Sequence, residues 1–90
     1  MENIKHTAGT WYAKEGQIYP TETGKTLALI PYFDEDNEEQ KANAKLIAAA
    51  PELLEMCIAT LKYLQSGELT GNATECAIIN LRDAIRNATN

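Results

Sequence analysis

The sequence predicts an α+β fold in two layers, a small antiparallel β-meander followed by an α-helical hairpin. Two observations predict it. Residues 1–33 hold the single Trp, the single Phe and three of the four Tyr, which are residue types that favour strands. Residues 38–90 are rich in Ala, Leu, Ile, Glu and Lys, which favour helices. We expect one domain over residues 1–90, with a strand-rich part at 1–33 and a helical part at 38–90.

Three short strands are expected in the first part. Residues 11–14 and 17–20 are the first two, separated by a two-residue turn. Residues 25–30 alternate only weakly between apolar and polar side chains, which predicts a largely buried third strand. Pro31 cannot donate to a ladder, so this strand is expected to end there or to lie at a sheet edge. A meander of three or four strands fits these lengths.

The sequence of residues 38–90 predicts a short helix followed by a helical hairpin. The first helix begins near residue 38, because the carboxylates of the acidic run 34–39 suit the positive end of a helix, and it ends before Pro51. Pro51 suits the first turn of a second helix. After a loop at 66–71, a last helix completes an antiparallel hairpin packed on the meander. The second helix carries an apolar stripe at Leu53, Leu54, Cys57, Ile58, Leu61 and Leu64.

Charge and composition exclude several classes of protein. The net charge of −5 argues against a DNA-binding protein, which needs a basic face for phosphates. The chain has no apolar run of about 20 residues, so no membrane span is expected. The start of the chain has no apolar segment behind Lys5, so no secretory signal is expected. We therefore expect a cytoplasmic protein in which Cys57 and Cys76 are buried free thiols.

Catalytic and metal-binding patterns are missing from the sequence. It has no nucleophile elbow, no phosphate-binding glycine loop and no HExxH. His6 is the single histidine and there is no CxxC, so neither a metal site nor a cofactor is expected. The sequence thus favours a binding protein over an enzyme.

Three groups of residues are candidates for ligand binding. Arg82 and Arg86 lie four apart, where both could hold a phosphate or pair with a carboxylate such as that of Asp83. Asn43 lies between two alanines, where its amide could read a base edge or cap a neighbouring loop. Five aromatic residues of the strand half could stack on a base or fill a thin core: Trp11, Tyr12, Tyr19, Tyr32 and Phe33.

Two segments carry a resemblance to a known family. Residues 6–11, HTAGTW, resemble the His-Thr-Pro-Gly-Pro-Trp opening of a large group of small phage proteins. Residues 41–54, KANAKLIAAAPELL, resemble their second signature, Asn-Ala-Arg-Leu-Ile-Ala-Ala-Ala-Pro-Glu-Leu-Leu. This chain has Ala8 and Thr10 in place of two prolines, and Lys45 in place of the arginine. The best understood members of the group are Thoeris anti-defence proteins, called sponges.

The resemblance implies a function and a site. Sponges bind the cyclic ADP-ribose isomers that infected bacteria make as an alarm, without cleaving them, and some also hold CBASS cyclic oligonucleotides. They form dimers and hexamers with ligand pockets between protomers. A phage protein of this kind is expected to act in the host cytoplasm. In the family an aromatic residue stacks on adenine, an Asn contacts the nucleotide and a helical Arg completes the pocket. The matching residues here are Phe33, Asn43 and Arg82, with Arg86, Trp11 and Tyr32 as further candidates.

Two further expectations follow from the residues themselves. A 90-residue chain has a marginal core, and Leu46, Ile47 and Ile79 fall off the main apolar stripes, so self-association is expected. The rival to a nucleotide sponge is an inhibitor that binds a host defence enzyme through the acidic run 34–39.

Overall fold

The computed structural model describes residues 5–67 and 71–89. The chain divides into two compact units. Residues 5–52 form the first, which we call the sheet unit, and the described residues from 53 to 89 belong to the second, which we call the hairpin unit. The order of elements is three strands and then three helices, so the predicted α+β class is confirmed.

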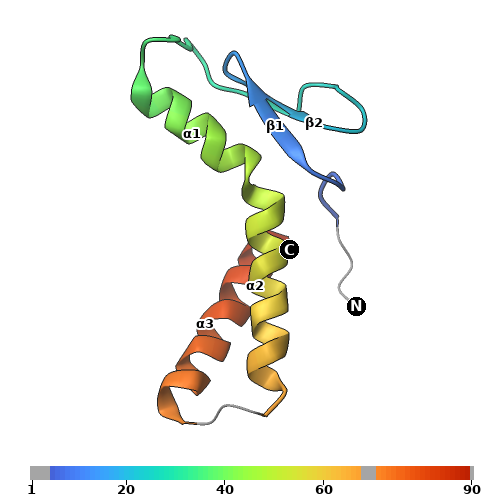
Figure 1. Ribbon diagram of the computed structural model, residues 1–90, viewed down its shortest axis with the longest axis vertical. Coiled ribbons are helices and arrows are strands. Elements are labelled where there is room, and N and C mark those ends of the chain that lie inside the picture. Colours follow the sequence, from blue (N-terminus) through green and yellow to red (C-terminus); the bar gives the residue numbers. More distant parts are fainter. Residues whose placement is uncertain (1–4, 68–70, 90) are drawn as a thin grey trace. The chain divides into compact units, whose positions relative to one another are not determined.

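The sheet has three antiparallel strands in the order β1-β2-β3. They are β1 (Trp11–Lys14), β2 (Gln17–Pro20) and β3 (Ala28–Leu29), so the predicted meander is confirmed and the first two strands have the predicted bounds (Figure 1).

A tight turn joins β1 to β2. Its two residues, Glu15 and Gly16, have φ values of 53° and 77°. Two consecutive positive φ values are characteristic of the type I′ hairpin turn, whose twist matches that of the flanking strands. The turn therefore fixes the register in which Lys14 lies opposite Gln17.

The segment before β1 is built around Trp11. Its indole Nε1–H donates to the carbonyl of Thr7 at 3.2 Å, and the His6 ring meets the indole edge-on at 6.2 Å between centroids. Thr10 and Thr21 join the open end of the hairpin through their hydroxyls, 2.9 Å apart. The HTAGTW segment thus makes local contacts that anchor the chain entering the sheet.

The third strand differs from its prediction. It contains two residues instead of six, and both are exposed, with 63% of the Leu29 surface accessible. The expectation of a largely buried strand at 25–30 is therefore wrong. β3 pairs with β2 alone and lies at the edge of the sheet, and Leu29 is opposite Gln17, which places it on the face that does not carry Ile18. The edge position suggested by Pro31 is confirmed.

Helix α1 (Glu38–Ala48) packs against β1 and β2. The Asn37 side chain caps it by accepting from the backbone N–H of Gln40 at 3.0 Å. Ala44 and Ala48, one turn apart, are buried, and Ile18 of β2 is completely buried. Small side chains let a helix approach a sheet closely, and Ile18, Ala44 and Ala48 are the buried apolar side chains where α1 packs on the sheet.

The hairpin unit consists of α2, from Leu53 onward, and α3, and the two helices run side by side in opposite directions (Figure 1). α2 (Ala50–Gln65) and α3 (Asn72–Thr89) confirm the predicted helical hairpin, whose packing on the sheet stays a prediction. On α3, Ile85 is buried. On α2, Leu53 is exposed, and the other residues of the predicted apolar stripe are half-buried.

The cysteine prediction is wrong for one residue and only partly right for the other. Both thiols are free, but Cys57 is half-buried and Cys76 is exposed. Cys76 lies on a different side of α3 from the sheltered positions, which are Thr74, Ala77, Ile78, Leu81, Ile85 and Thr89.

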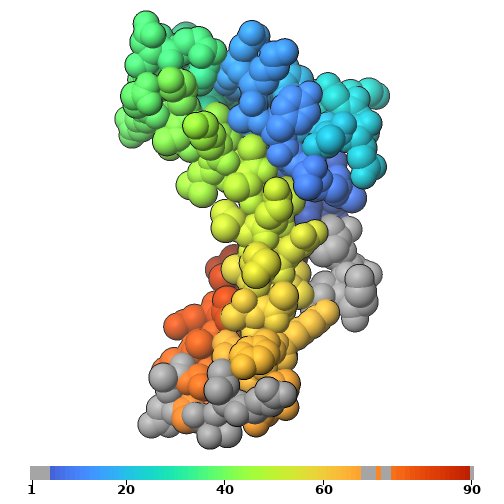
Figure 2. Space-filling model, in the orientation of Figure 1, coloured from blue at the N-terminus to red at the C-terminus, as the bar shows by residue number. Residues whose placement is uncertain are grey.

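Large apolar side chains lie open on the hairpin unit. Side chains of α2 stand exposed on the face that Figure 2 shows. The accessible fractions are 63% for Met56, 54% for Tyr63 and 55% for Ile79 of α3. On α1, Leu46 and Ile47 are exposed too, as expected from their positions off the stripes. Over residues 5–67 and 71–89, no helix is long and apolar enough to cross a membrane.

Candidate functional site

A pocket of about 230 Å³ lies in the sheet unit, where the β1–β2 turn meets α1. Strand and turn supply one wall, α1 supplies the other, and the segment between β3 and α1 supplies an aromatic ring. We call it the lysine–aromatic pocket; its lining is Ala13, Lys14, Glu15, Gly16, Phe33, Glu35, Lys41, Ala44 and Lys45.

Phe33 is seated directly on the turn between β1 and β2. A methyl group placed on Gly16 would lie 2.4 Å from Cγ of Phe33, so there is no room for a side chain at this position. Gly16 therefore has two roles: it adopts the positive φ of the turn, and it leaves the space that the ring occupies. The ring is half-buried, so part of it remains available to a ligand.

Gln40 holds the aromatic segment in place from α1. Its amide oxygen accepts from the backbone N–H of Asp34 at 2.7 Å, and its amide nitrogen donates to the carbonyl of Tyr32 at 3.3 Å. Asp34 tightens the same segment, because its carboxylate accepts from the N–H of Asp36 at 2.9 Å. The backbone on both sides of Phe33 is thus fixed by one glutamine.

Tyr32 has an uncommon conformation. Its φ is 55°, in the left-handed region, and 97% of its surface is accessible. Such a conformation costs a residue with a side chain about 1–3 kcal/mol, and an exposed ring recovers none of this by burial. Asn or Gly would adopt this backbone at lower cost. The aromatic ring at this position therefore contributes nothing visible to the fold.

The charged residues that line this pocket are three lysines, Lys14, Lys41 and Lys45, and two glutamates, Glu15 and Glu35. Lys41 and Lys45 are four residues apart, so they lie on one face of α1 together with buried Ala44. Lys41 pairs with Glu38 at 3.0 Å. Within the described ranges, no carboxylate lies within the 4.0 Å limit of an ion pair with Lys14 or Lys45. These two ammonium groups are available to an anion.

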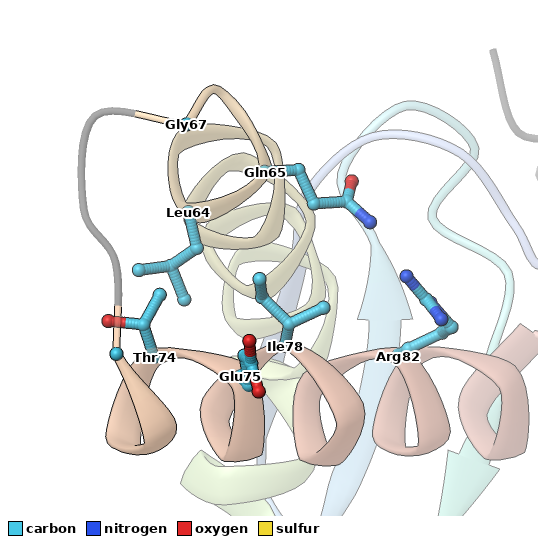
Figure 3. A pocket seen from close by; sticks show the side chains of 8 residues that line it. Leu64, Gln65, Gly67, Thr74, Glu75, Ile78 and Arg82 are labelled. Carbon is cyan, nitrogen blue, oxygen red and sulfur yellow. The ribbon is translucent and has the colours of Figure 1, made fainter.

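A second pocket, of about 470 Å³, lies at the closed end of the hairpin unit, and we call it the hairpin pocket. Leu64 and Gln65 line it from α2, and Ile78 and Arg82 line it from α3 (Figure 3). It is completed by Gly67, Gly71, Thr74 and Glu75. Its polar groups carry both signs of charge, from the Arg82 guanidinium and the Glu75 carboxylate.

The sequence-predicted residues fall in different places. Phe33 lines the lysine–aromatic pocket and Tyr32 is its neighbour in sequence. Asn43 is exposed on α1 and does not line this pocket, because it lies off the stripe formed by Lys41, Ala44 and Lys45. Trp11 is engaged by the chain before β1.

The two arginines belong to the hairpin unit. Arg82 lines the hairpin pocket, whereas Arg86 pairs with Asp83 at 3.5 Å on an exposed surface. Such a pair contributes little to stability. Phe33 and Arg82 thus line separate pockets within this chain.

Sequence reasoning missed four contributors to the lysine–aromatic pocket: Lys14, Lys41, Lys45 and the supporting Gln40. One signal could have found Lys41 and Lys45. They are four residues apart on a helix that follows the aromatic pair 32–33, and residues four apart lie on the same face of a helix. The role of Gln40 had no such signal, because its partners depend on the path of the segment that precedes α1. In the part of the chain that the structure describes, no cluster of three or more His, Cys, Asp or Glu could hold a metal ion.

By fold and pocket, the chain is a small α+β protein whose aromatic pocket is lined by three lysines and two glutamates. A family model described as Salmonella phage P22 protein Y8K6 matches residues 1–90, so the chain belongs to this phage protein family.

A curated relative is also of phage type. The chain is 39% identical over 56 residues to the phage-like element PBSX protein XkdD of Bacillus subtilis (strain 168). The match covers 62% of this chain and 47% of that protein, so the chain spans about half the length of the relative. No solved structure matches the chain.

Proposed function

We propose that this phage-family protein binds and sequesters a cyclic nucleotide immune signal, a cyclic ADP-ribose isomer of the Thoeris type, without cleaving it. Membership of a phage protein family supports a role in infection. The resemblance of residues 6–11 and 41–54 to nucleotide sponges supports this ligand class. CBASS cyclic oligonucleotides are a second ligand class within the same proposal.

The observation that carries the proposal is the lysine–aromatic pocket. A nucleotide presents a flat base and negatively charged phosphates, and this pocket offers the Phe33 ring beside Lys14 and Lys45. A stacked ring contributes about 1–3 kcal/mol to binding, and a charge-assisted contact with a phosphate about 1.5–3 kcal/mol. Local lysines let a chain of net charge −5 hold an anion.

Sequestration makes modest demands on the protein. It requires affinity and copy number, and no positioned acid, base or metal. We propose accordingly that the protein is not an enzyme and that no cofactor takes part.

We also propose self-association, as a dimer or hexamer in which ligand lies between protomers. The exposed Leu46, Met56 and Ile79 support it, because a small soluble domain seldom leaves so many large apolar side chains in water without a partner. Pooling the lysines of two copies would strengthen anion binding further.

The central test is capture and release. The protein is incubated with cyclic ADP-ribose, separated from free ligand by filtration, and heat-denatured, and the released molecule is identified by mass spectrometry. We expect intact cyclic ADP-ribose in the released fraction. Release of a hydrolysed or linear product would replace sequestration with catalysis, and release of nothing from this ligand or from cyclic oligonucleotides would refute the proposal.

Matched variants locate the site. Lys14→Gln and Lys45→Gln should each weaken binding by about tenfold or more, whereas Lys62→Gln on α2 should leave it unchanged, because Lys62 lines neither pocket. Phe33→Leu keeps apolar packing on Gly16 but removes the flat ring, so binding should fall while folding persists. If Arg82→Gln abolishes binding and these variants do not, the ligand occupies the hairpin pocket.

The rival function, inhibition of a host enzyme through the acidic run, gives the opposite pattern. Asp36→Asn and Glu39→Gln remove exposed charges at positions that do not line the lysine–aromatic pocket. Loss of anti-defence activity in these variants, with activity retained in Lys45→Gln, would favour the protein-binding function.

A further inference from the structure

Helix α2 has a second apolar stripe, on its exposed side. Met56, Ala59 and Tyr63 are open to solvent, with 63% of the Met56 surface and 54% of the Tyr63 surface accessible. They are separated by three and four residues, which is the spacing of the residues that meet when two helices pair along their length. Leu53, 50% accessible, and Thr60 border these residues on one side. We call Met56, Ala59 and Tyr63 the outer stripe.

The other side of the outer stripe carries two opposite charges. Glu55 directly precedes Met56, and Lys62 directly precedes Tyr63, so the two charges are seven residues apart and lie on the same flank. Both residues are exposed, and within residues 5–67 and 71–89 neither forms an ion pair. This flank is therefore negative in its N-terminal half and positive in its C-terminal half.

This order of charges makes the surface complementary to a second copy of itself. When two such helices lie antiparallel, each half of one helix faces the opposite half of the other. Glu55 then lies beside the partner's Lys62, and Lys62 lies beside the partner's Glu55. A parallel pair would bring like halves together and would gain no such attraction. Two equal contacts related by a two-fold axis are the commonest form of interface between identical chains.

The apolar residues suit the same arrangement. Ala59 lies in the middle of the outer stripe, where a small side chain lets two helix axes approach closely. Met56 and Tyr63 lie on either side of it, and both residue types are enriched at protein interfaces. None of the three lines either of the two pockets described above. A contact through the outer stripe therefore leaves the proposed ligand-binding residues unused.

We infer that the outer stripe of α2 is a two-fold interface between copies of this chain, in which the two α2 helices pack antiparallel in the absence of ligand. The inference rests on the self-association proposed above and adds to it the surface, the orientation and the independence from nucleotide. Met56, Ala59 and Tyr63 provide the apolar contact, and Glu55 and Lys62 set the orientation.

Light scattering of the full chain without ligand tests the apolar contact. A two-fold contact joins copies in pairs, so Met56→Ser and Tyr63→Ser should each halve the molar mass at the lowest concentration at which the parent is fully assembled. Leu29→Ser, at a position in the sheet unit that is as accessible as Met56, is the matched control and should keep the mass of the parent. Circular dichroism should show the helix content of the parent in all three variants, because each changes a residue that is exposed within the chain.

Charge reversal tests the orientation. Glu55→Lys and Lys62→Glu each replace two attractions by two repulsions, and each should raise the dissociation constant by about tenfold or more. Lys62→Gln removes the attractions without adding repulsions, so it should remain assembled at micromolar concentration. An equimolar mixture of the Glu55→Lys and Lys62→Glu chains should assemble again. The double variant should do the same, because both experiments restore opposite charges across the axis.

A disulfide across the two-fold axis gives an independent measurement. In chains whose two native cysteines are changed to serine, Ala59→Cys should form a covalent dimer on mild oxidation, because Ala59 is close to the axis. Ser66→Cys, seven residues further along, should form none, since antiparallel packing places the two copies of this residue about 20 Å apart. Covalent dimers from both variants would mean parallel helices and would overturn the inference.

The outcomes for this interface and for nucleotide binding are separable. If the parent is monomeric without ligand and assembles only with cyclic ADP-ribose, the inference is wrong and the proposed function stands. If the parent assembles without ligand but the outer-stripe and charge-reversal variants keep its mass, the copies meet elsewhere and the inference is wrong. If these variants halve the mass while the parent retains neither cyclic ADP-ribose nor cyclic oligonucleotides, the inference stands and the proposed ligand is wrong.

Discussion

The two units of this protein are built in different ways. The sheet unit is held by specific geometry: a type I′ turn, a helix cap and a glutamine that binds two backbone groups. The hairpin unit is held by half-buried apolar stripes on two helices, with Ile85 as its buried residue. Hydrogen bonds and turns have directional requirements, whereas apolar stripes tolerate adjustment.

The difference indicates where a precise binding site can form. The Phe33 ring lies so close to Gly16 that no side chain would fit at that position, and Gln40 holds the backbone next to Phe33. The hairpin unit instead presents Met56, Tyr63 and Ile79 to solvent. We therefore expect ligand recognition in the sheet unit and self-association through the hairpin unit, and the following predictions test that division.

The largest effect is expected at the core of the sheet unit. Ile18→Ala should reduce the free energy of unfolding by about 2–5 kcal/mol, because Ile18 is completely buried and the buried apolar residues of α1, which packs on β2, are alanines too small to fill a cavity. Chemical denaturation measures the loss. Leu29→Ala, at a position 63% accessible in the same unit, is the matched control and should change stability by less than about 0.5 kcal/mol.

The next effect concerns the turn beneath Phe33. Gly16→Ala should cost about 2–4 kcal/mol, since the new methyl group would collide with Phe33 and the positive φ disfavours a side chain. Gly24→Ala has a similar φ of 69° and open space around it, so it should cost only about 1 kcal/mol. Equal losses for the two variants would show that Phe33 does not occupy the turn.

A smaller effect is expected at the cap of α1. Asn37→Ala removes the acceptor for the Gln40 N–H and should cost about 1 kcal/mol. Asn37→Asp keeps an acceptor and adds a favourable charge at the helix N-terminus, so it should be neutral or stabilising. The same denaturation assay distinguishes the two, and a loss in both would mean that the amide itself is required.

The smallest effect on folding is expected on the hairpin unit. Ile79→Ser should lower the apparent molar mass in light scattering at micromolar concentration, and at dilutions where the parent is monomeric it should leave the unfolding temperature nearly unchanged. Tyr12→Ser in the sheet unit removes a ring that stacks on Tyr19 at 5.2 Å and should not change the oligomeric state. A monomeric parent would remove the basis for assigning self-association to this unit.

The two thiols, those of Cys57 and Cys76, are expected to differ in reactivity, and this can be measured without changing the stability of the protein. Cys76 is exposed and Cys57 is half-buried, so a thiol reagent should modify Cys76 first in the folded protein. Cys76→Ser should remove the fast phase of the modification reaction, and Cys57→Ser should remove the slow phase.

The order and type of the elements could be predicted from local sequence signals. Gly16 marked the first turn, the acidic run 34–39 marked the start of α1, and Pro51 separated α1 from α2, because each signal acts on its own few residues. It also indicated Phe33 as a ligand-facing candidate, and the ring does line a pocket.

Which of these residues share a site depends on how distant segments pack, and the sequence did not predict it. The third strand was expected to be buried from its apolar composition, but its edge position leaves Leu29 exposed. Asn43 and Lys45 are two residues apart, yet the face that α1 turns to the sheet brings only Lys45 to the pocket. Local signals fix elements, whereas a pocket depends on which faces of distant segments meet, and that is settled by packing.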